Sequence, residues 1–242
     1  MKPLLRLDTV SRSHWRGPRE LRILRDVSLD VHAGEVVAVY GQRGAGKTTL
    51  LRIAAGFEPP DAGSVSFDGV SLGRRSRREL ARLRRDEIGW VERAGPQSAE
   101  LPVLTYVALP LYRSCGPLTA QRRAMEALMH VGAVDTAELP WSNLSDTARI
   151  LVALAQALVR QPRLLLVDDP TGGLGILDRE RVVGLLRSAA EDCGLAVLMA
   201  VPDLPAMLHA HEVRMLSRGR LLAPSERQTG TVIAFPGSER SA

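Results

Sequence analysis

Apolar residues along this chain follow two spacings, one typical of strands and one typical of helices. Short apolar or alternating runs predict strands, whereas longer segments with apolar residues three or four positions apart predict helices. The predicted strands cover residues 4–10, 21–31, 36–40, 64–67, 88–91, 164–167 and 195–200. The predicted helices cover residues 119–131, 145–160 and 178–191, with earlier helices after residue 48 and after residue 71. Because apolar strands alternate with helices, we expect an α/β fold with a mostly parallel sheet covered on both faces.

The order of these segments also predicts the domain organisation. We expect the strands near the N-terminus to form an antiparallel β subdomain, and a helical subdomain to be inserted over about residues 93–160. A proline-bearing connection leads into the helical subdomain, and a small hairpin over residues 213–216 and 220–222 closes the fold. Residues 1–223 are therefore predicted to form one domain, and the polar residues 224–242 a mobile C-terminal tail.

A glycine-rich run between a strand and a helix carries the clearest chemical signal. It comprises Gly41, Gln42, Arg43, Gly44, Ala45, Gly46, Lys47 and Thr48, and Thr49 follows it. Glycines let consecutive backbone N–H groups turn toward phosphate oxygens. Lys47 is placed to reach the β- and γ-phosphates, and the Thr48 hydroxyl to ligate Mg²⁺. The alternative is a glycine-rich turn with a chance Lys-Thr pair, but the flanking strand and helix favour a phosphate-binding loop and a P-loop NTPase core.

A second acidic element follows the apolar strand at residues 164–167. The strand ends in Asp168 and Asp169. In a phosphate-loop fold a carboxylate at such a strand end holds Mg²⁺, directly or through water, and this predicts a metal-binding role for Asp168. Asp169 is then placed to orient or deprotonate an attacking water. The alternative is an acidic turn that merely ends the strand.

Charge and hydropathy limit the possible partners. The formal net charge of +5, from 32 basic and 27 acidic residues, is moderate, so a nucleic-acid partner is not implied. No apolar run reaches transmembrane length, and Arg6 and Asp8 interrupt the apolar segment that a signal peptide would need. We therefore expect a cytoplasmic chain, and any association with the inner face of the cell membrane would have to come through a partner.

Much of the positive charge lies in one cluster on the predicted helix after residue 71. Its members are Arg74, Arg75, Arg77, Arg78, Arg82, Arg84 and Arg85. A solvated basic face is the common explanation for such a cluster. The sharper alternative is contact with anionic lipid headgroups or with an acidic protein segment.

In combination these motifs resemble the nucleotide-binding subunit of ABC transporters, most nearly the lipoprotein-release and macrolide-export type. The resemblance covers about residues 4–222. It rests on the phosphate loop, the strand ending in Asp168 with Pro170-Thr171-Gly172 after it, and the apolar run 107–111. It implies ATP and Mg²⁺ as cofactors and a transmembrane permease subunit as partner. It also implies a dimer of nucleotide-binding subunits, homomeric or heteromeric, that closes head to tail around two ATP molecules.

Several residues depart from the family pattern at positions that serve ATP hydrolysis. Asp169 stands where the family has a catalytic Glu, and its carboxylate is set back by about one methylene. Pro202 stands where a His contacts the γ-phosphate, and proline has neither an imidazole nor a backbone N–H. Arg93 replaces a Gln, with Gln97 available only after a register shift, and Gly175 replaces an Asp. We therefore expect impaired hydrolysis.

The family's signature motif, which contacts the ATP of the partner subunit, departs furthest. Ser145 is retained, but Asp146 and Thr147 replace two glycines. The Asp146 carboxylate is able to bond to the N–H groups of its own helix and is expected to repel an approaching phosphate, which would make this chain a poor partner for the ATP of another subunit. The alternative is that the substitution is simply tolerated. His14, with Trp15 beside it, aligns with an aromatic residue that stacks on adenine; the alternative is an exposed loop residue without a role.

These observations predict an ATP-binding subunit of an ABC-type membrane transporter that binds Mg-ATP and hydrolyses it slowly or only with a partner. The alternative is a regulatory ATP sensor that signals to a membrane protein without moving a substrate. An unrelated phosphate-loop kinase or GTPase is a third possibility, but no Asn-Lys-x-Asp guanine-recognition motif is evident.

Overall fold

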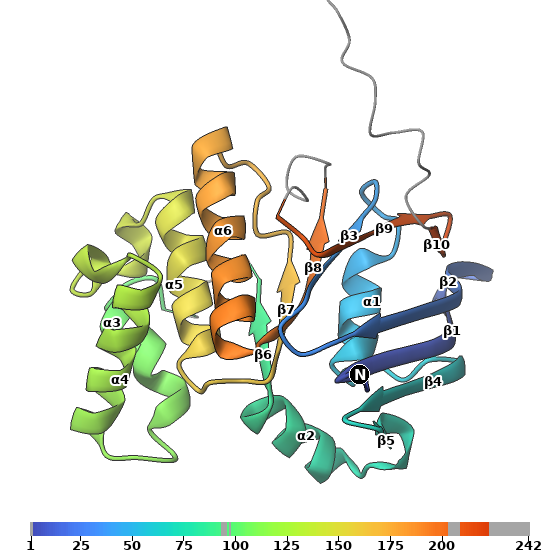
Figure 1. The fold of residues 1–242 in the computed structure, drawn as a ribbon, viewed down its shortest axis with the longest axis horizontal. Coiled ribbons are helices and arrows are strands. Elements are labelled where there is room, and N and C mark those ends of the chain that lie inside the picture. Colours follow the sequence, from blue (N-terminus) through green and yellow to red (C-terminus); the bar gives the residue numbers. More distant parts are fainter. Residues whose placement is uncertain (1, 93–95, 97, 203–208, 223–242) are drawn as a thin grey trace, which may run out of the picture.

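The computed structural model describes residues 2–92, 96, 98–202 and 209–222, and it confirms the α/β fold (Figure 1). An antiparallel sheet contains, in spatial order, β2 (Arg19–Val31), β1 (Leu5–Arg16), β4 (Ala62–Phe67) and β5 (Val70–Ser71). A second sheet contains β10 (Arg220–Leu222), β9 (Glu212–Ser217), β3 (Val36–Tyr40), β8 (Ala196–Val201), β7 (Leu164–Asp168) and β6 (Ile88–Val91). Its strands are parallel except for the antiparallel β9–β10 hairpin.

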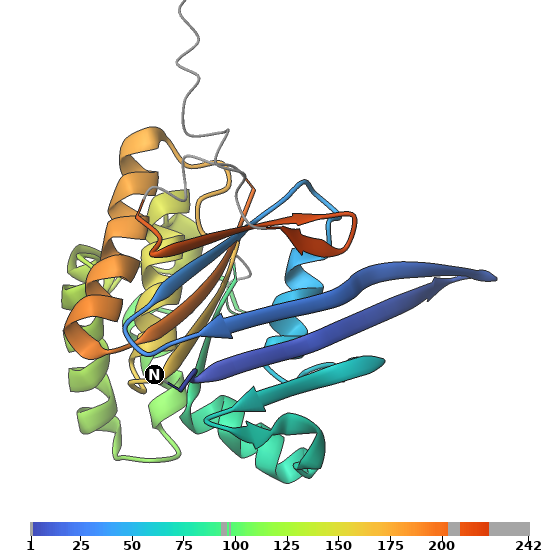
Figure 2. The ribbon, with the colours of Figure 1, turned by 45° about the vertical axis from the view of Figure 1, so that its right-hand side comes forward.

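Helices cover both faces of the second sheet. Helices α1 (Lys47–Ala54), α2 (Arg77–Asp86), α5 (Asp146–Leu158) and α6 (Ile176–Cys193) contact its strands. Helices α3 (Val103–Ala108) and α4 (Pro117–His130) pack against α5 instead. Figure 2 shows α5 and α6 on one side of this sheet, and α1 on the other side, toward the antiparallel sheet. Within the described residues, no helix combines the length and the hydropathy needed to cross a bilayer.

The sequence of β3 shows why its sheet is covered on both faces. Val36 and Ala38 belong to the apolar core shared with α5 and α6, whereas Val37 and Val39 belong to the core shared with α1 and the antiparallel sheet. Successive strand residues point to opposite faces, so an apolar run buries both. The phosphate loop therefore starts from a strand that is fixed on two sides.

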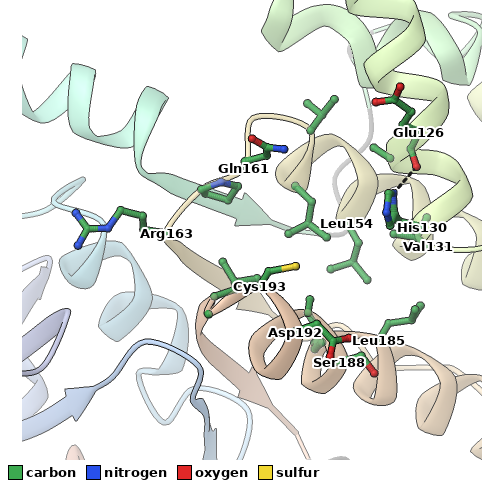
Figure 3. Close-up of a pocket in the computed structure, with 18 of the residues that line it drawn as sticks. Glu126, His130, Val131, Leu154, Gln161, Arg163, Leu185, Ser188, Asp192 and Cys193 are labelled. Atoms are coloured by element: carbon green, nitrogen blue, oxygen red, sulfur yellow. Dashed lines mark hydrogen bonds between the residues drawn. The ribbon is translucent and has the colours of Figure 1, made fainter. Parts of the chain in front are cut away.

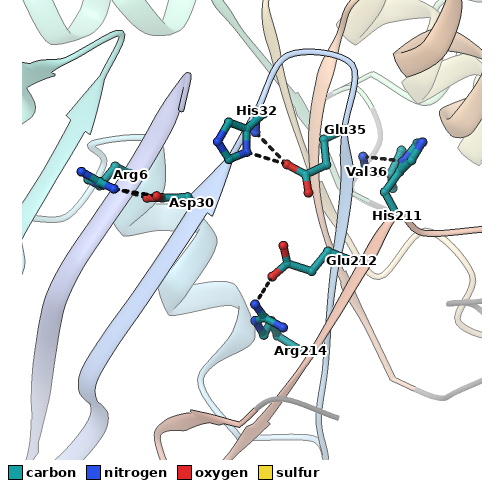
Figure 4. A network of polar contacts seen from close by, with 8 residues as sticks. All are labelled: Arg6, Asp30, His32, Glu35, Val36, His211, Glu212 and Arg214. Atoms are coloured by element: carbon teal, nitrogen blue, oxygen red, sulfur yellow. Dashed lines mark hydrogen bonds and ion pairs between the residues drawn. The ribbon is translucent and has the colours of Figure 1, made fainter. Parts of the chain in front are cut away.

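Polar contacts hold the turn between the two sheets (Figure 4). A carboxylate oxygen of Glu35 accepts from the His32 backbone N–H at 2.9 Å and lies 3.0 Å from Nδ1 of the same residue. The Val36 N–H donates to Nδ1 of His211 at 3.0 Å. These contacts tie the start of β3 to β2 and to the segment before β9.

Two segments differ from the expectations. Strand β1 continues to Arg16, well beyond the predicted end at residue 10, and it forms a long hairpin with β2, which lies close to its predicted bounds. The segment predicted as a proline-bearing connection contains helix α3, which buries Val103, Tyr106 and Val107. This helix has fewer than two turns, so its apolar periodicity is too short to recognise. The start of the helical subdomain at about residue 93 stays a prediction. The mobile tail over residues 224–242 also stays a prediction, because it lies outside the described residues.

Candidate nucleotide-binding site

The glycines of the phosphate loop are required by close packing and by backbone conformation. Gly44 and Gly46 have φ angles of 83° and 104°, which side-chain-bearing residues rarely adopt. A Cβ on Gly46 would lie 2.9 Å from Cγ2 of Ile23 in β2, and one on Gly41 would collide with the carbonyl oxygen of Leu216 in β9. The loop is thus clamped between strands of both sheets.

The first turn of α1 is arranged to meet an anion. Its N-cap, Gly46, makes no side-chain capping bond, and the first turn contains no acidic residue. The free N–H groups and the helix dipole both favour a phosphate there. Lys47 Nζ donates to the carbonyl oxygens of Gly41 at 2.5 Å and Gln42 at 3.2 Å. Burial lowers the pKa of Lys47, and the charges of Asp169 and Asp168 oppose this shift.

The fold brings the two predicted metal-binding residues into direct contact. Thr48, at the start of α1, donates a hydrogen bond of 2.7 Å to Asp168 at the end of β7. Burial raises the pKa of Asp168, while the Thr48 bond and the Lys47 charge lower it. Among the described residues, no three His, Cys, Asp or Glu side chains gather around a common point. A hydroxyl and one carboxylate fit Mg²⁺, which takes its other ligands from water and phosphate.

The Asp169 carboxylate is engaged in the turn that follows β7. Asp169 adopts a left-handed conformation with φ 51°, and its N–H donates to the Ala200 carbonyl at 2.9 Å. Its Oδ1 accepts a hydrogen bond of 2.9 Å from the Gly172 N–H. A side chain held in this way stabilises the local turn. The sequence contained this signal, because Asp followed three residues later by Gly is typical of such turns.

The start of α5 shows which residue of the altered signature motif caps the helix. Ser145 is the N-cap, and its Oγ accepts from the Ala148 N–H at 3.2 Å, as the predicted cap requires. Asp146 does not cap the helix, contrary to one expectation. Its exposed carboxylate instead lies 3.7 Å from Arg149 Nη1. An acidic side chain, paired with Arg149, is therefore exposed at this helix start.

Thr147 makes a contact that the sequence did not suggest. Its Oγ1 donates a hydrogen bond of 2.8 Å to Asp178 in the first turn of α6. This bond joins the start of α5 to the start of α6 across 31 residues of sequence. No local pattern predicts such a contact.

The other departures have different structural settings. Gly175 is the N-cap of α6, and a Cβ built on it would meet no atom within 4 Å. Pro202 is exposed directly after β8. Arg93 and Gln97 lie outside the described residues. The aspartate of the family pattern is therefore missing at position 175 although the site has room for it.

His14 lies on β1 and pairs with Leu21 of β2, two residues before the Ile23 that packs against Gly46. Its Nε2 lies 3.4 Å from an oxygen of Glu58. Trp15 is 73% exposed. His14 is thus on β1, which pairs with the strand that packs against the phosphate loop, and its role toward adenine stays a prediction.

A separate cavity of about 650 Å³ lies between α4, α5 and α6 (Figure 3). Its walls include Leu154, Leu185 and Val131, with His130 and Asp192 among the polar lining residues. None of its lining residues belongs to the phosphate loop or to the acidic pair at the end of β7. It is distinct from the candidate nucleotide site.

A glycine-clamped phosphate loop, an open helix start and a Thr-Asp pair beside it define a phosphate-loop nucleotide-binding protein. The model of the ABC transporter family matches residues 24–172. The chain therefore belongs to the ABC transporter family.

Similar proteins agree with this assignment. The chain is 36% identical over 219 residues to the lipoprotein-releasing system ATP-binding protein LolD of Chromohalobacter salexigens, covering 90% of this chain and 92% of that one. It is 34% identical to the macrolide export ATP-binding/permease protein MacB 1/2 of Paracoccus denitrificans, of which it spans 35%. A solved dimeric structure of the bacterial ABC transporter cassette MJ0796 superposes with a TM-score of 0.83 at 28% identity, covering 90% of this chain and 96% of that one. The same cassette has been solved with ADP and Pi.

Proposed function

We propose that this chain is the ATP-binding subunit of an ABC-type membrane transporter. It binds Mg-ATP through residues 41–48 and drives or gates a transmembrane permease subunit, which holds it on the cytoplasmic face of the membrane. The observation that carries the proposal is the 2.7 Å contact of Thr48 with Asp168 beside an uncapped helix start. The LolD and MacB relatives, which are named as ATP-binding proteins of release and export systems, support the permease partner.

The working unit is a dimer of nucleotide-binding subunits, formed by two copies of this chain or by this chain and a related one. The dimeric MJ0796 cassette supports this part of the proposal. In a head-to-tail dimer, the phosphate loop of one subunit faces Ser145, Asp146 and Thr147 of the other. The exposed Asp146 carboxylate then approaches the γ-phosphate, which is unfavourable for two negative charges.

Hydrolysis is slow in this proposal because the groups that would activate water are weak or absent. Asp169 stands directly after Asp168, at the position expected for the general base, and its Oδ1 already accepts a hydrogen bond from the Gly172 N–H. Pro202 offers no side-chain or backbone donor to a γ-phosphate. The chain therefore holds ATP in a site suited to binding more than to rapid turnover.

Measuring ATP affinity and ATP turnover on the same purified chain tests the proposal. Lys47→Ala should weaken Mg-ATP binding by more than about tenfold, since it removes a charge-assisted phosphate contact. Lys2→Ala is the matched control, because Lys2 is the other lysine of the sequence and lies on the surface beside Asp68. It should leave affinity unchanged.

The turnover measurement then tests whether the chain hydrolyses ATP slowly. Binding that depends on Lys47, with turnover far below about 1 per second, supports a slow ATPase. Turnover at or above that rate would refute impaired hydrolysis. An ATP affinity that Lys47→Ala leaves unchanged would refute the phosphate loop as the ATP-binding site. Reconstitution with the permease separates transport from sensing, because a sensor closes on ATP without moving a substrate.

A further inference from the structure

The two ends of helix α2 differ in how their arginines are paired. Near its C-terminus, Arg85 makes two hydrogen bonds of 2.8 Å to Asp86, and Arg82 lies 3.6 Å from the same carboxylate. Arg84 donates to the Gly56 carbonyl oxygen at 2.8 Å. These three arginines are therefore already engaged within the protein.

At the start of α2 the arginines lack such partners. Arg74, Arg77 and Arg78 are exposed and make no hydrogen bond or ion pair with another residue in the described part of the chain. The acid in this turn, Glu79, has its carboxylate oxygen occupied by the N–H and the Oγ of Ser76, at 2.8 and 2.6 Å. Its negative charge is held at the helix cap.

We call Arg74, Arg75, Arg77 and Arg78 the arginine patch. Its position is unfavourable for the isolated protein, because like charges repel and because the N-terminus of a helix already carries positive partial charge. The Nε of Arg75 is buried, and within the described residues it has no hydrogen-bond partner. One acid, Glu79, lies among these four arginines and interacts electrostatically with Arg75, so the patch keeps an excess of positive charge. The patch is therefore better suited to an external anion.

The patch lies away from the nucleotide site. Helix α2 leads into the amino end of β6, whereas the phosphate loop and Asp168 follow the carboxyl ends of β3 and β7. Figure 1 shows α2 at the opposite end of the sheet from the tips of β6 and β7. A second subunit that covers the nucleotide site leaves the arginine patch exposed.

The segment that carries the patch has the composition of an electrostatic surface. No large apolar residue between positions 72 and 86 is exposed, since Leu72 and Leu83 are buried and the partly buried Leu80 packs against the core. The exposed Phe57 lies under Arg84, near the other end of α2. Protein interfaces usually need an apolar centre, whereas a charged bilayer surface does not. Guanidinium groups also pair well with phosphate oxygens.

From this, we propose that the arginine patch binds the anionic lipid headgroups of the membrane on which the subunit works. The proposal rests on the proposed function for the location of the chain at a membrane, and it adds a direct lipid contact. Each arginine near such a surface strengthens binding by about fivefold, so removing three should weaken binding by on the order of 100-fold at low salt.

Co-sedimentation of the full chain with vesicles, without ATP, tests this contact. The chain should bind vesicles of phosphatidylcholine with phosphatidylglycerol and not vesicles of phosphatidylcholine alone. Binding should weaken steeply between about 0.05 and 0.5 M salt, because screening shortens the reach of the field. The variant Arg74→Gln/Arg77→Gln/Arg78→Gln should lose the binding. Its Tm should not fall, since the substitutions relieve repulsion at a helix start.

A matched variant controls for net charge. Arg19→Gln/Arg22→Gln/Arg25→Gln removes the same formal charge from exposed positions on β2 and should keep vesicle binding. Equal losses in both variants, or no binding of the natural chain to anionic vesicles, would overturn the proposal. If the chain bound immobilised poly-glutamate through the arginine patch but did not bind anionic vesicles, the lipid proposal would be overturned in favour of an acidic protein segment. Unchanged ATP affinity in these experiments leaves the proposed function standing.

Discussion

Replacing Asp169 tests whether its carboxylate stabilises a turn or activates water. Oδ1 accepts from the Gly172 N–H at 2.9 Å, and the residue has φ 51°. Asp169→Asn keeps an oxygen at this place and tolerates the left-handed conformation, so it should cost about 1 kcal/mol or less. Asp169→Ala loses the acceptor and strains the backbone, which together cost about 2–3 kcal/mol.

Thermal unfolding and ATP turnover give separate readouts for these two variants. For a chain of this length each kcal/mol corresponds to roughly 2–4 °C in Tm, so Asp169→Ala should unfold about 4–12 °C lower while Asp169→Asn stays near the natural chain. Residual turnover of Asp169→Asn should fall by less than about tenfold, because a carboxylate tied to a turn contributes little as a base. A folded Asp169→Asn protein that loses about 100-fold or more in turnover would show that Asp169 is an effective general base and that our reasoning is wrong.

Two further predictions concern the acidic pair and the missing aspartate. Burial raises the pKa of Asp168 in the native state, so the ionised carboxylate lowers the free energy of unfolding. This loss of stability grows as the pH rises from about 3.9, the ordinary carboxyl pKa, to the raised pKa of the native state. Asp168→Asn should therefore raise Tm at neutral pH, and this increase should shrink as the pH falls toward about 4. In the same variant, Mg²⁺ should no longer strengthen ATP binding. An equal increase in Tm at every pH would contradict the explanation by burial of the charged carboxylate. Gly175→Asp should fold with Tm unchanged or slightly higher, because its Cβ meets no atom within 4 Å and its carboxylate can cap α6. A clear fall in Tm, measured by scanning fluorimetry, would mean that this helix start tolerates only glycine.

Much of the nucleotide site was predictable because its parts are local in sequence. The glycines, Lys47 and Thr48 are consecutive with a strand and a helix, and Asp168 ends an apolar strand. Ser145 is recognisable as a cap from the residues directly after it, and the structure confirms that role. Helix α3 was missed because six residues are too few to display a helical period.

The contacts that modify the site were not predictable to the same degree. The bond from Thr147 to Asp178 joins two helix starts, and the packing of Gly46 on Ile23 joins two sheets. Neither leaves a pattern in neighbouring residues, because each depends on how separate elements pack. The same holds for Arg84 of the arginine cluster, which donates to the Gly56 carbonyl oxygen across 28 residues of sequence, whereas the partner of Arg85 is its neighbour Asp86.

By itself, the sequence determined the strand and helix order, the phosphate loop and the family resemblance, since these follow from residue types at short, fixed spacings. Only the tertiary structure decided which charged groups are already satisfied. It places the Asp168 carboxylate on Thr48, and it leaves the Asp146 carboxylate exposed beside Arg149. The physical reason is that the chemistry of a carboxylate depends on its burial and on its hydrogen-bond partners, and the packing of the fold sets both.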